Sequence, residues 1–186
     1  LLDESEIQRI VGEVEARHGR LDILVNNAGI AIDDGTLKPS QQTMATWRTT
    51  FDTNLFGLVA VTNAFLPLLH ASKSARIVNV SSLLGSIREH LNPGSFIYDF
   101  KIPAYNVSKT AVNAWTVQLA HELRGSTVKV NTIHPGYVKT DMNKHGDEQN
   151  GELEVADGAR TSVRLALIDD DGPSGGFFYG DDALPW

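Results

Sequence analysis

The 186-residue chain contains no cysteine. This absence excludes disulfide bonds, thiolate metal sites and cysteine nucleophiles. It is compatible with a reducing compartment, and we expect a cytoplasmic protein. The six histidines do not follow the spacing of zinc ligands, so we also expect no metal.

Long hydrophobic runs and excess positive charge are absent too. No uninterrupted apolar run approaches ~18 residues, so we expect no membrane-spanning helix and no membrane partner. The chain has 16 Lys and Arg against 23 Asp and Glu, a net charge of −7. Such a chain repels a phosphate backbone, which argues against a nucleic-acid partner. The 41% hydrophobic and 21% charged residues are typical of one globular domain.

Apolar spacing along the chain alternates between the helical and the strand period. It predicts helices over 5–18, 40–71, 104–123 and 155–168, and strands over 21–25, 76–80, 128–133 and 175–179. Residues 83–103 read as a long loop, and 141–154 as a polar, mobile segment. This alternation favours an α/β fold with a parallel sheet that is covered on both faces. The alternative is a flavodoxin-like sheet without the chemistry considered next.

Tyr105 and Lys109 form the strongest chemical pair. Positions i and i+4 share one helix face, so the phenol and the ammonium can address one site. A nearby cation favours phenolate and would lower the tyrosine pKa, which suits a general acid or base. Taken alone, the pair is also compatible with an ordinary solvated helix face.

Three further polar segments indicate that Tyr105 and Lys109 belong to a ligand site. Ser81-Ser82 ends a predicted strand, Asn26-Asn27-Ala28-Gly29 ends an earlier one, and Asn54 lies inside a predicted helix. In an open α/β sheet, ligands bind beyond the carboxyl ends of the strands. We therefore expect these segments to meet at one edge of the sheet.

The motifs N-N-A-G, T-N-x-x-G, V-S-S, Y-x-x-x-K and H-P-G-x-V-x-T-D occur here in the order of the short-chain dehydrogenase/reductase family, which the chain resembles throughout. Finer features resemble the carbonyl-reductase branch: Val25–Ala31, Pro135–Met142 and a closing Trp186. The resemblance implies a Rossmann-type doubly wound parallel sheet in a single domain.

The resemblance also implies catalytic roles. Tyr105 would donate a proton to the carbonyl oxygen, and Lys109 would hold the nicotinamide ribose and lower the tyrosine pKa. Ser82 would hydrogen-bond the substrate oxygen, and Asn54 would help to hold a water for proton relay. Ser81 would only end its strand.

Cofactor contacts follow from the same resemblance. Besides Tyr105 and Lys109, Asn27 would lie near the adenosine ribose, and Val138 and Thr140 would contact the nicotinamide amide. The expected cofactor is NADP, with NAD possible, because the residues that distinguish the two belong to a segment this sequence does not contain.

Two departures from the family pattern stand out. No glycine-rich G-x-x-x-G-x-G loop occurs, so we expect the chain to be the C-terminal part of a domain, an excerpt or a truncation that lacks leading strands and helices. Strand 21–25 would then have one sheet neighbour, and residues 1–186 alone would bind no dinucleotide. Second, the gap between Ser82 and Tyr105 predicts an insertion at about 85–103, and 141–154 would form a substrate lid.

The resulting hypothesis is reduction of a ketone or aldehyde with NADPH. NAD-dependent alcohol oxidation and a non-catalytic nucleotide-sensing regulator on the same fold remain alternatives. The partner would be a small-molecule carbonyl or alcohol, and the protein a monomer or small homo-oligomer. Phe96 and Tyr98 either form an apolar substrate wall or pack within their loop.

Overall fold

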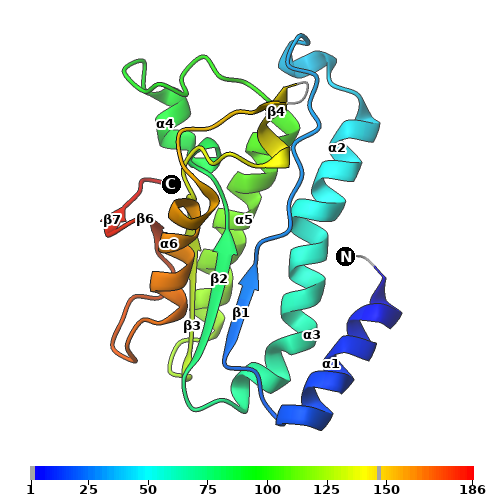
Figure 1. Cartoon of the computed structure of the whole chain (residues 1–186), viewed down its shortest axis with the longest axis vertical. Helices are drawn as coiled ribbons and strands as arrows, with labels where there is room; N and C mark the ends of the chain where they lie inside the picture. The colour runs from blue at the N-terminus through cyan, green and yellow to red at the C-terminus, as the bar shows by residue number, and fades with distance from the viewer. Residues whose placement is uncertain (1–2, 146–147) are drawn as a thin grey trace.

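The computed structural model describes residues 3–145 and 148–186. Its centre is a five-stranded sheet in the order β1-β2-β3-β6-β7 (Figure 1). The strands are β1 (Ile23–Asn26), β2 (Ala75–Val80), β3 (Val128–Ile133), β6 (Phe177–Tyr179) and β7 (Asp182–Ala183). The first four run parallel, and β7 turns back antiparallel to β6. The predicted α/β class with a parallel-dominated sheet is confirmed, while β7 is an addition that the sequence analysis missed.

Strand β1 lies at an edge of this sheet. Within the described residues it pairs with β2 alone, in a register that runs from Ile23 opposite Arg76 to Asn26 opposite Asn79. The prediction of one neighbour for this strand is therefore confirmed. Ile23 and Val25 remain 40% and 41% exposed, so apolar side chains line an open edge.

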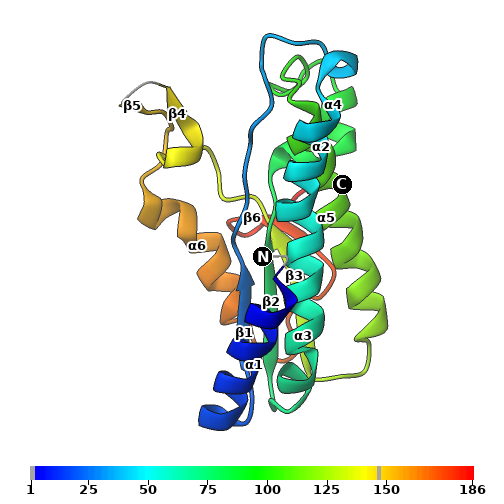
Figure 2. The same cartoon turned by 90° about the vertical axis from the view of Figure 1, so that its right-hand side faces the viewer.

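Helices cover both faces of the sheet, as Figure 2 shows. One face carries α3 (Leu58–His70) and α5 (Pro103–Glu122), with α1 (Glu4–His18) packed on α3. The opposite face carries α6 (Val155–Ala166), which contacts β1, β2 and β3. Helices α1, α5 and α6 agree with the predicted ranges to within two residues, whereas α3 is only the last part of the helix predicted over 40–71.

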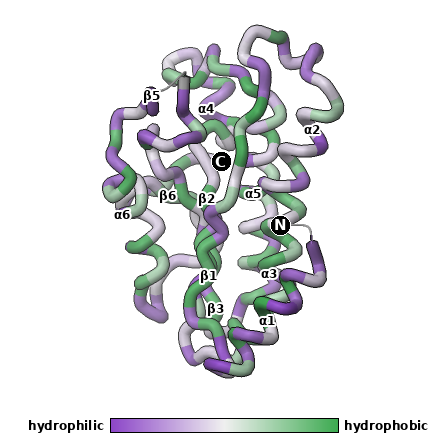
Figure 3. Tube along the Cα trace, turned by 45° about the vertical axis from the view of Figure 1, so that its right-hand side comes forward, coloured by the Kyte–Doolittle hydropathy of each residue, from purple (hydrophilic) through white to green (hydrophobic). Residues whose placement is uncertain are grey.

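The main core lies between the sheet and the α3–α5 layer. Its fully buried members include Leu69 of α3, Leu119 of α5 and Ile77 and Val130 of the central strands. The hydrophobic colouring of these segments is visible along the trace in Figure 3. Because both faces of the central strands are covered, their sequences read as nearly continuous apolar runs.

The helix predicted over 40–71 is not one regular helix. It consists of η1 (Pro39–Gln41), α2 (Met44–Phe51), a π-helical turn η2 (Asp52–Gly57) and α3. By length and composition alone, the continuous segment Met44–His70 qualifies as a membrane-spanning candidate. The criterion of an uninterrupted apolar run therefore missed it. In the fold, its apolar side chains pack against α1, α5 and the sheet, as those of a core helix do.

The prediction that residues 83–103 form one long loop is only partly correct. They contain η3 (Leu83–Gly85) and α4 (Ile87–Leu91) before the chain enters α5. Helix α4 begins after Ser86, whose hydroxyl accepts the Glu89 N–H at 3.2 Å. That Ser-x-x-Glu spacing is a helix-start signal, but five residues are too few for apolar periodicity to show.

Candidate active site

The polar segments expected at one sheet edge do lie together at the carboxyl ends of β1, β2 and β3. The first turn of α5 and the η2 turn lie at the same end (Figure 1). Ser81 and Ser82 follow β2 directly, and the Ser81 hydroxyl donates to the Lys109 carbonyl at 3.2 Å. Ser81 therefore joins β2 to α5, which agrees with the structural role expected of it.

Tyr105 lies in the first turn of α5 and is 7% exposed. Burial raises the pKa of its phenol to about 12. The nearby Ser82 hydroxyl has a smaller, opposite effect and lowers this pKa. The Ser82 oxygen also accepts the Leu84 N–H at 3.2 Å, which fixes its place at the start of η3. Tyr105 and Ser82 are therefore brought together as predicted.

Lys109 lies one turn further along α5, 3% exposed, and donates to the Val80 carbonyl at 2.8 Å. Burial lowers the pKa of its ammonium to about 8. Its Nζ lies 5.6 Å from the centre of the Tyr105 ring. The expectation that Lys109 lowers the Tyr105 pKa is wrong for this structure, because burial dominates and raises that pKa instead.

Asn54 is 1% exposed within the η2 turn. Its Oδ1 accepts the Ile30 N–H at 2.8 Å, and its Nδ2 donates to the Ile30 carbonyl and the Ser108 hydroxyl, both at 2.9 Å. Both amide hydrogens are thus used within the protein. The predicted role in holding a water remains a prediction, and the observed bonds place Asn54 as a brace between the β1–η1 segment and α5.

Gly29 marks the point where these side chains converge. A Cβ at this glycine would lie 3.3 Å from Lys109 Nζ, 3.4 Å from Asn54 Oδ1 and 3.9 Å from Met142 Cε. The absence of a side chain thus leaves space beside a buried amine and an amide oxygen. A side chain at this position would crowd the buried amine and the amide oxygen, so the glycine keeps the approach to both groups open. Gly29 and Met142 were not among the predicted site residues.

The N-N-A-G motif divides its roles between its two asparagines. Asn26 is buried, and its Nδ2 donates to Thr62 Oγ1 at 2.9 Å and to Asn79 Oδ1 at 2.8 Å, which ties β1 to α3 and β2. Asn27 is exposed, and its N–H donates to the Val25 carbonyl. The structure does not bring Asn27 to Tyr105, and its predicted contact with an adenosine ribose remains a prediction.

Val138 and Thr140 follow β3, in the segment that leads to η4 (Asp141–Asn143). Val138 packs against Gly158 of α6, where a Cβ would lie 2.5 Å from Val138 Cγ2, and Thr140 precedes η4. Their predicted contacts with the nicotinamide amide remain predictions. Met142, two residues on, is the part of this segment that approaches Gly29.

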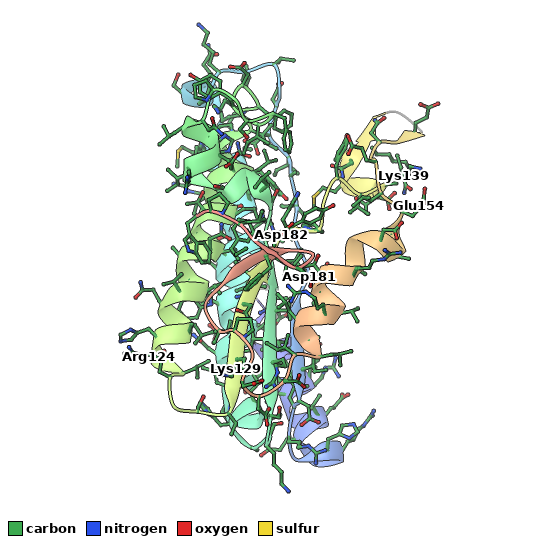
Figure 4. The ribbon with its side chains drawn as sticks, turned by 90° about the vertical axis from the view of Figure 1, so that its left-hand side faces the viewer. Arg124, Lys129, Lys139, Glu154, Asp181 and Asp182 are labelled. Carbon is green, nitrogen blue, oxygen red and sulfur yellow. The ribbon has the colours of Figure 1, made fainter. Side chains whose placement is uncertain are left out.

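The predicted substrate lid 141–154 has more structure than a mobile loop. It contains η4 and a short hairpin, β4 (Lys144–His145) and β5 (Glu148–Gln149), and Gly146 lies outside the described residues. An ion pair between Lys139 and Glu154 at 2.5 Å lies at its base (Figure 4). Closure of this segment over a ligand remains a prediction.

Sequence reasoning missed one charged residue of the site entirely. Asp33 accepts the N–H of Ala104 at 2.8 Å and that of Tyr105 at 3.0 Å. It lies 72 residues before Tyr105, in a segment without periodicity, so only the tertiary fold links the two.

The parallel sheet, with serine, tyrosine and lysine at its carboxyl edge, defines an oxidoreductase of the Rossmann type. Residues 1–151 match the family model described as short chain dehydrogenase. (+)-Neomenthol dehydrogenase of Capsicum annuum is 30% identical, over 96% of this chain and 76% of its own length. Salutaridine reductase of Papaver bracteatum is 34% identical, over 89% of this chain and 70% of its own length.

Solved structures give the same result. NADPH-bound carbonyl reductase from chicken fatty liver superimposes with a TM-score of 0.82 and 26% identity, over 99% of this chain and 74% of that one. Carbonyl reductase Sniffer of D. melanogaster has a TM-score of 0.82 and 28% identity, over 99% and 75%. The chain belongs to the short-chain dehydrogenase/reductase family, whose members are oxidoreductases that bind NAD(P).

Proposed function

We propose that this protein reduces a ketone or aldehyde to an alcohol with NADPH, and that Tyr105 is the proton donor. The observation that carries the proposal is the buried Tyr105 phenol, which is close enough to the Ser82 hydroxyl for Ser82 to lower its pKa and lies one helical turn from Lys109. A phenol with a pKa of about 12 is fully protonated at neutral pH, as a donor must be.

Each polar group has a defined task in this scheme. The Ser82 hydroxyl hydrogen-bonds the substrate carbonyl oxygen and holds it beside the Tyr105 hydroxyl. Tyr105 passes its proton to that oxygen as the oxygen gains negative charge. The Lys109 ammonium, held by the Val80 carbonyl, hydrogen-bonds the ribose beside Gly29. Within the family's chemistry, a bound nicotinamide supplies the hydride.

The preference for NADPH and for a carbonyl substrate draws support from the relatives. The chicken structure contains NADPH, and several relatives are named as reductases. Aromatic side chains of the insertion that precedes Tyr105 form exposed apolar surface, with Phe96 at 83% and Phe100 at 51% exposure. We therefore propose an apolar ketone as the first substrate class to test.

The test is to follow NADPH absorbance with a panel of cyclic ketones, aromatic aldehydes and small polar carbonyls, using the purified protein in the longest form that its gene encodes. Residues 1–186 alone, which we expect to bind no dinucleotide, are assayed in parallel. We expect carbonyl-dependent oxidation of NADPH that the Tyr105→Phe variant lacks. Faster turnover of an alcohol with NAD would favour the oxidation alternative. Dinucleotide binding without turnover of any panel member in either direction would contradict the proposal and favour the regulator.

A further inference from the structure

Helix α5 begins without a cap of its own. Its N-cap residue is Ile102, which has no side-chain acceptor, and Pro103 occupies the first helical position. Proline has no N–H, so the free donors of the first turn are the amides of Ala104 and Tyr105. The carboxylate of Asp33, from the segment after β1, accepts both of them, one on each oxygen.

The second backbone group of Tyr105 is also held. Its carbonyl accepts the Ser108 hydroxyl at 2.7 Å, and the Ser108 oxygen in turn accepts the Asn54 amide at 2.9 Å. Asn54 binds both backbone groups of Ile30, three residues before Asp33. A closed ring of contacts therefore runs from Asp33 to Tyr105, Ser108, Asn54, Ile30 and back.

This ring surrounds the residue on which the proposed chemistry depends. Hydrogen bonds hold both the N–H and the C=O of Tyr105, so its backbone, from which the side chain extends, is fixed. A displacement of about 1 Å at a reacting group can reduce a rate about 10²-fold. A loss of the Asp33 contacts would release the first turn of α5 and let the phenol drift from Ser82.

We infer that Asp33 is a positioning residue: its carboxylate caps α5 and thereby sets the place of the Tyr105 hydroxyl. This inference rests on the proposed function of Tyr105. Its structural part, the tertiary cap, stands on the two hydrogen bonds alone.

Asp34 provides a matched control. It is the adjacent residue, carries the same charge and belongs to the same segment. Its carboxylate accepts the Thr36 N–H at 2.9 Å and the Thr36 hydroxyl at 2.6 Å, so its hydrogen bonds are local. Asp33→Leu and Asp34→Leu thus remove the same charge, but only the first removes a contact with α5.

The experiment combines steady-state kinetics with amide hydrogen exchange on the protein. For Asp33→Leu we expect kcat to fall about 10- to 100-fold while KM for the carbonyl changes little, because binding groups remain in place. The amides of Ala104 and Tyr105 should exchange about tenfold faster or more, as for a helix that has lost its cap. Asp34→Leu should leave kcat and both amides at their wild-type values.

Equal loss of kcat in both variants, or wild-type protection of both amides in Asp33→Leu, would overturn the inference. If Asp33→Leu does not fold, Asp33→Asn decides. Its single acceptor oxygen should leave at least one of the two amides less protected and should lower kcat by a smaller factor. Unchanged exchange at both amides in Asp33→Asn would also overturn it. If the amides respond but Tyr105→Phe retains turnover, the proposed function fails while the cap stands.

Discussion

At the scale of single residues, burial acts on the two central side chains of the site in the same direction, toward the neutral form. It raises the pKa of Tyr105 to about 12 and lowers that of Lys109 to about 8. Each shift disfavours a charge in a poorly solvated place. At neutral pH the Tyr105 phenol is therefore protonated, as the proposed proton donor must be.

The Tyr105→Phe variant tests the hydroxyl alone. The ring and its packing remain, and only the group beside Ser82 is lost, so we expect kcat to fall by about 10²- to 10⁴-fold with cofactor affinity nearly intact. Tyr179→Phe, in β6, removes the same atom from a 40% exposed ring and serves as the control. A variant at position 105 that kept more than about a tenth of the wild-type kcat would refute the proton-donor role.

Lys109→Met separates cofactor binding from proton donation. Methionine keeps much of the side-chain volume but cannot donate to the Val80 carbonyl or to a ribose beside Gly29. We expect activity to be lost and the dissociation constant for NADPH to rise about tenfold or more, as for loss of one charged hydrogen bond. Fluorescence titration measures it, with exposed Lys73→Met as the control. Unchanged affinity would show that the ribose contact is wrong.

At the scale of elements, the site depends on how closely η3 packs on α5. Gly85 is buried at this contact, and a Cβ there would lie 2.8 Å from the Lys109 carbonyl carbon and 3.0 Å from the Thr110 nitrogen. The Gly85 carbonyl also accepts the Thr110 hydroxyl at 3.0 Å. The backbone of η3 therefore packs directly on the backbone of α5. A shift of either element would move Ser82 or Lys109.

Gly85→Ala should therefore lower the free energy of unfolding by about 1–3 kcal/mol, through overpacking, and should lower kcat as well. Gly12→Ala in α1 is the control: outside the adjoining part of α1, no atom of the described residues lies within 4 Å of its added Cβ. In a helix interior that change should stabilise by about 0.5–1 kcal/mol. Chemical denaturation of both variants measures the difference, and a Gly85→Ala protein as stable as the wild type would show that η3 can yield.

The same scale shows where sequence reasoning succeeded. Long helices and central strands were predictable because their apolar periods are set by burial on known faces. The short elements α4 and β7 were not, since five and two residues carry no period. Of the site, Tyr105, Lys109, Ser82 and Asn54 were found through motifs. Asp33 was not, because its partners are set by tertiary packing across 71 and 72 residues.

At the scale of the whole molecule, one half-buried histidine links stability to pH. His134 follows β3, its ring lies 5.2 Å from that of Tyr179, and its Nδ1 has no hydrogen-bond partner among the described residues. Burial lowers the pKa of His134 to about 4. The unfolded chain, with a pKa near 6.5, thus binds the proton more readily than the folded one.

The folded protein is therefore destabilised as the pH falls. The stability associated with neutral His134 is fully present above about pH 6.5 and is lost as the pH falls toward about 4, by at most about 1.4 kcal/mol per pH unit. Denaturation of wild type and His134→Gln at pH 4.5, 5.5 and 7 should show this difference, since the variant lacks the titrating group. Exposed His70→Gln controls for the loss of an imidazole. Parallel pH profiles for wild type and His134→Gln would contradict the assignment.

The π-helical turn η2 has a consequence for how this sequence tolerates changes in length. A π turn accommodates one residue more than an α-helical turn, and such turns are frequent at functional sites. Removal of a single residue from Asp52–Gly57 would let α2 and α3 join as one regular helix, but would rotate Asn54 by about 100° relative to one of them. Asn54 could then no longer hold both Ile30 and Ser108. A one-residue deletion here should thus yield a more regular helix and a less active protein, which makes length, and not only composition, a constraint on this stretch.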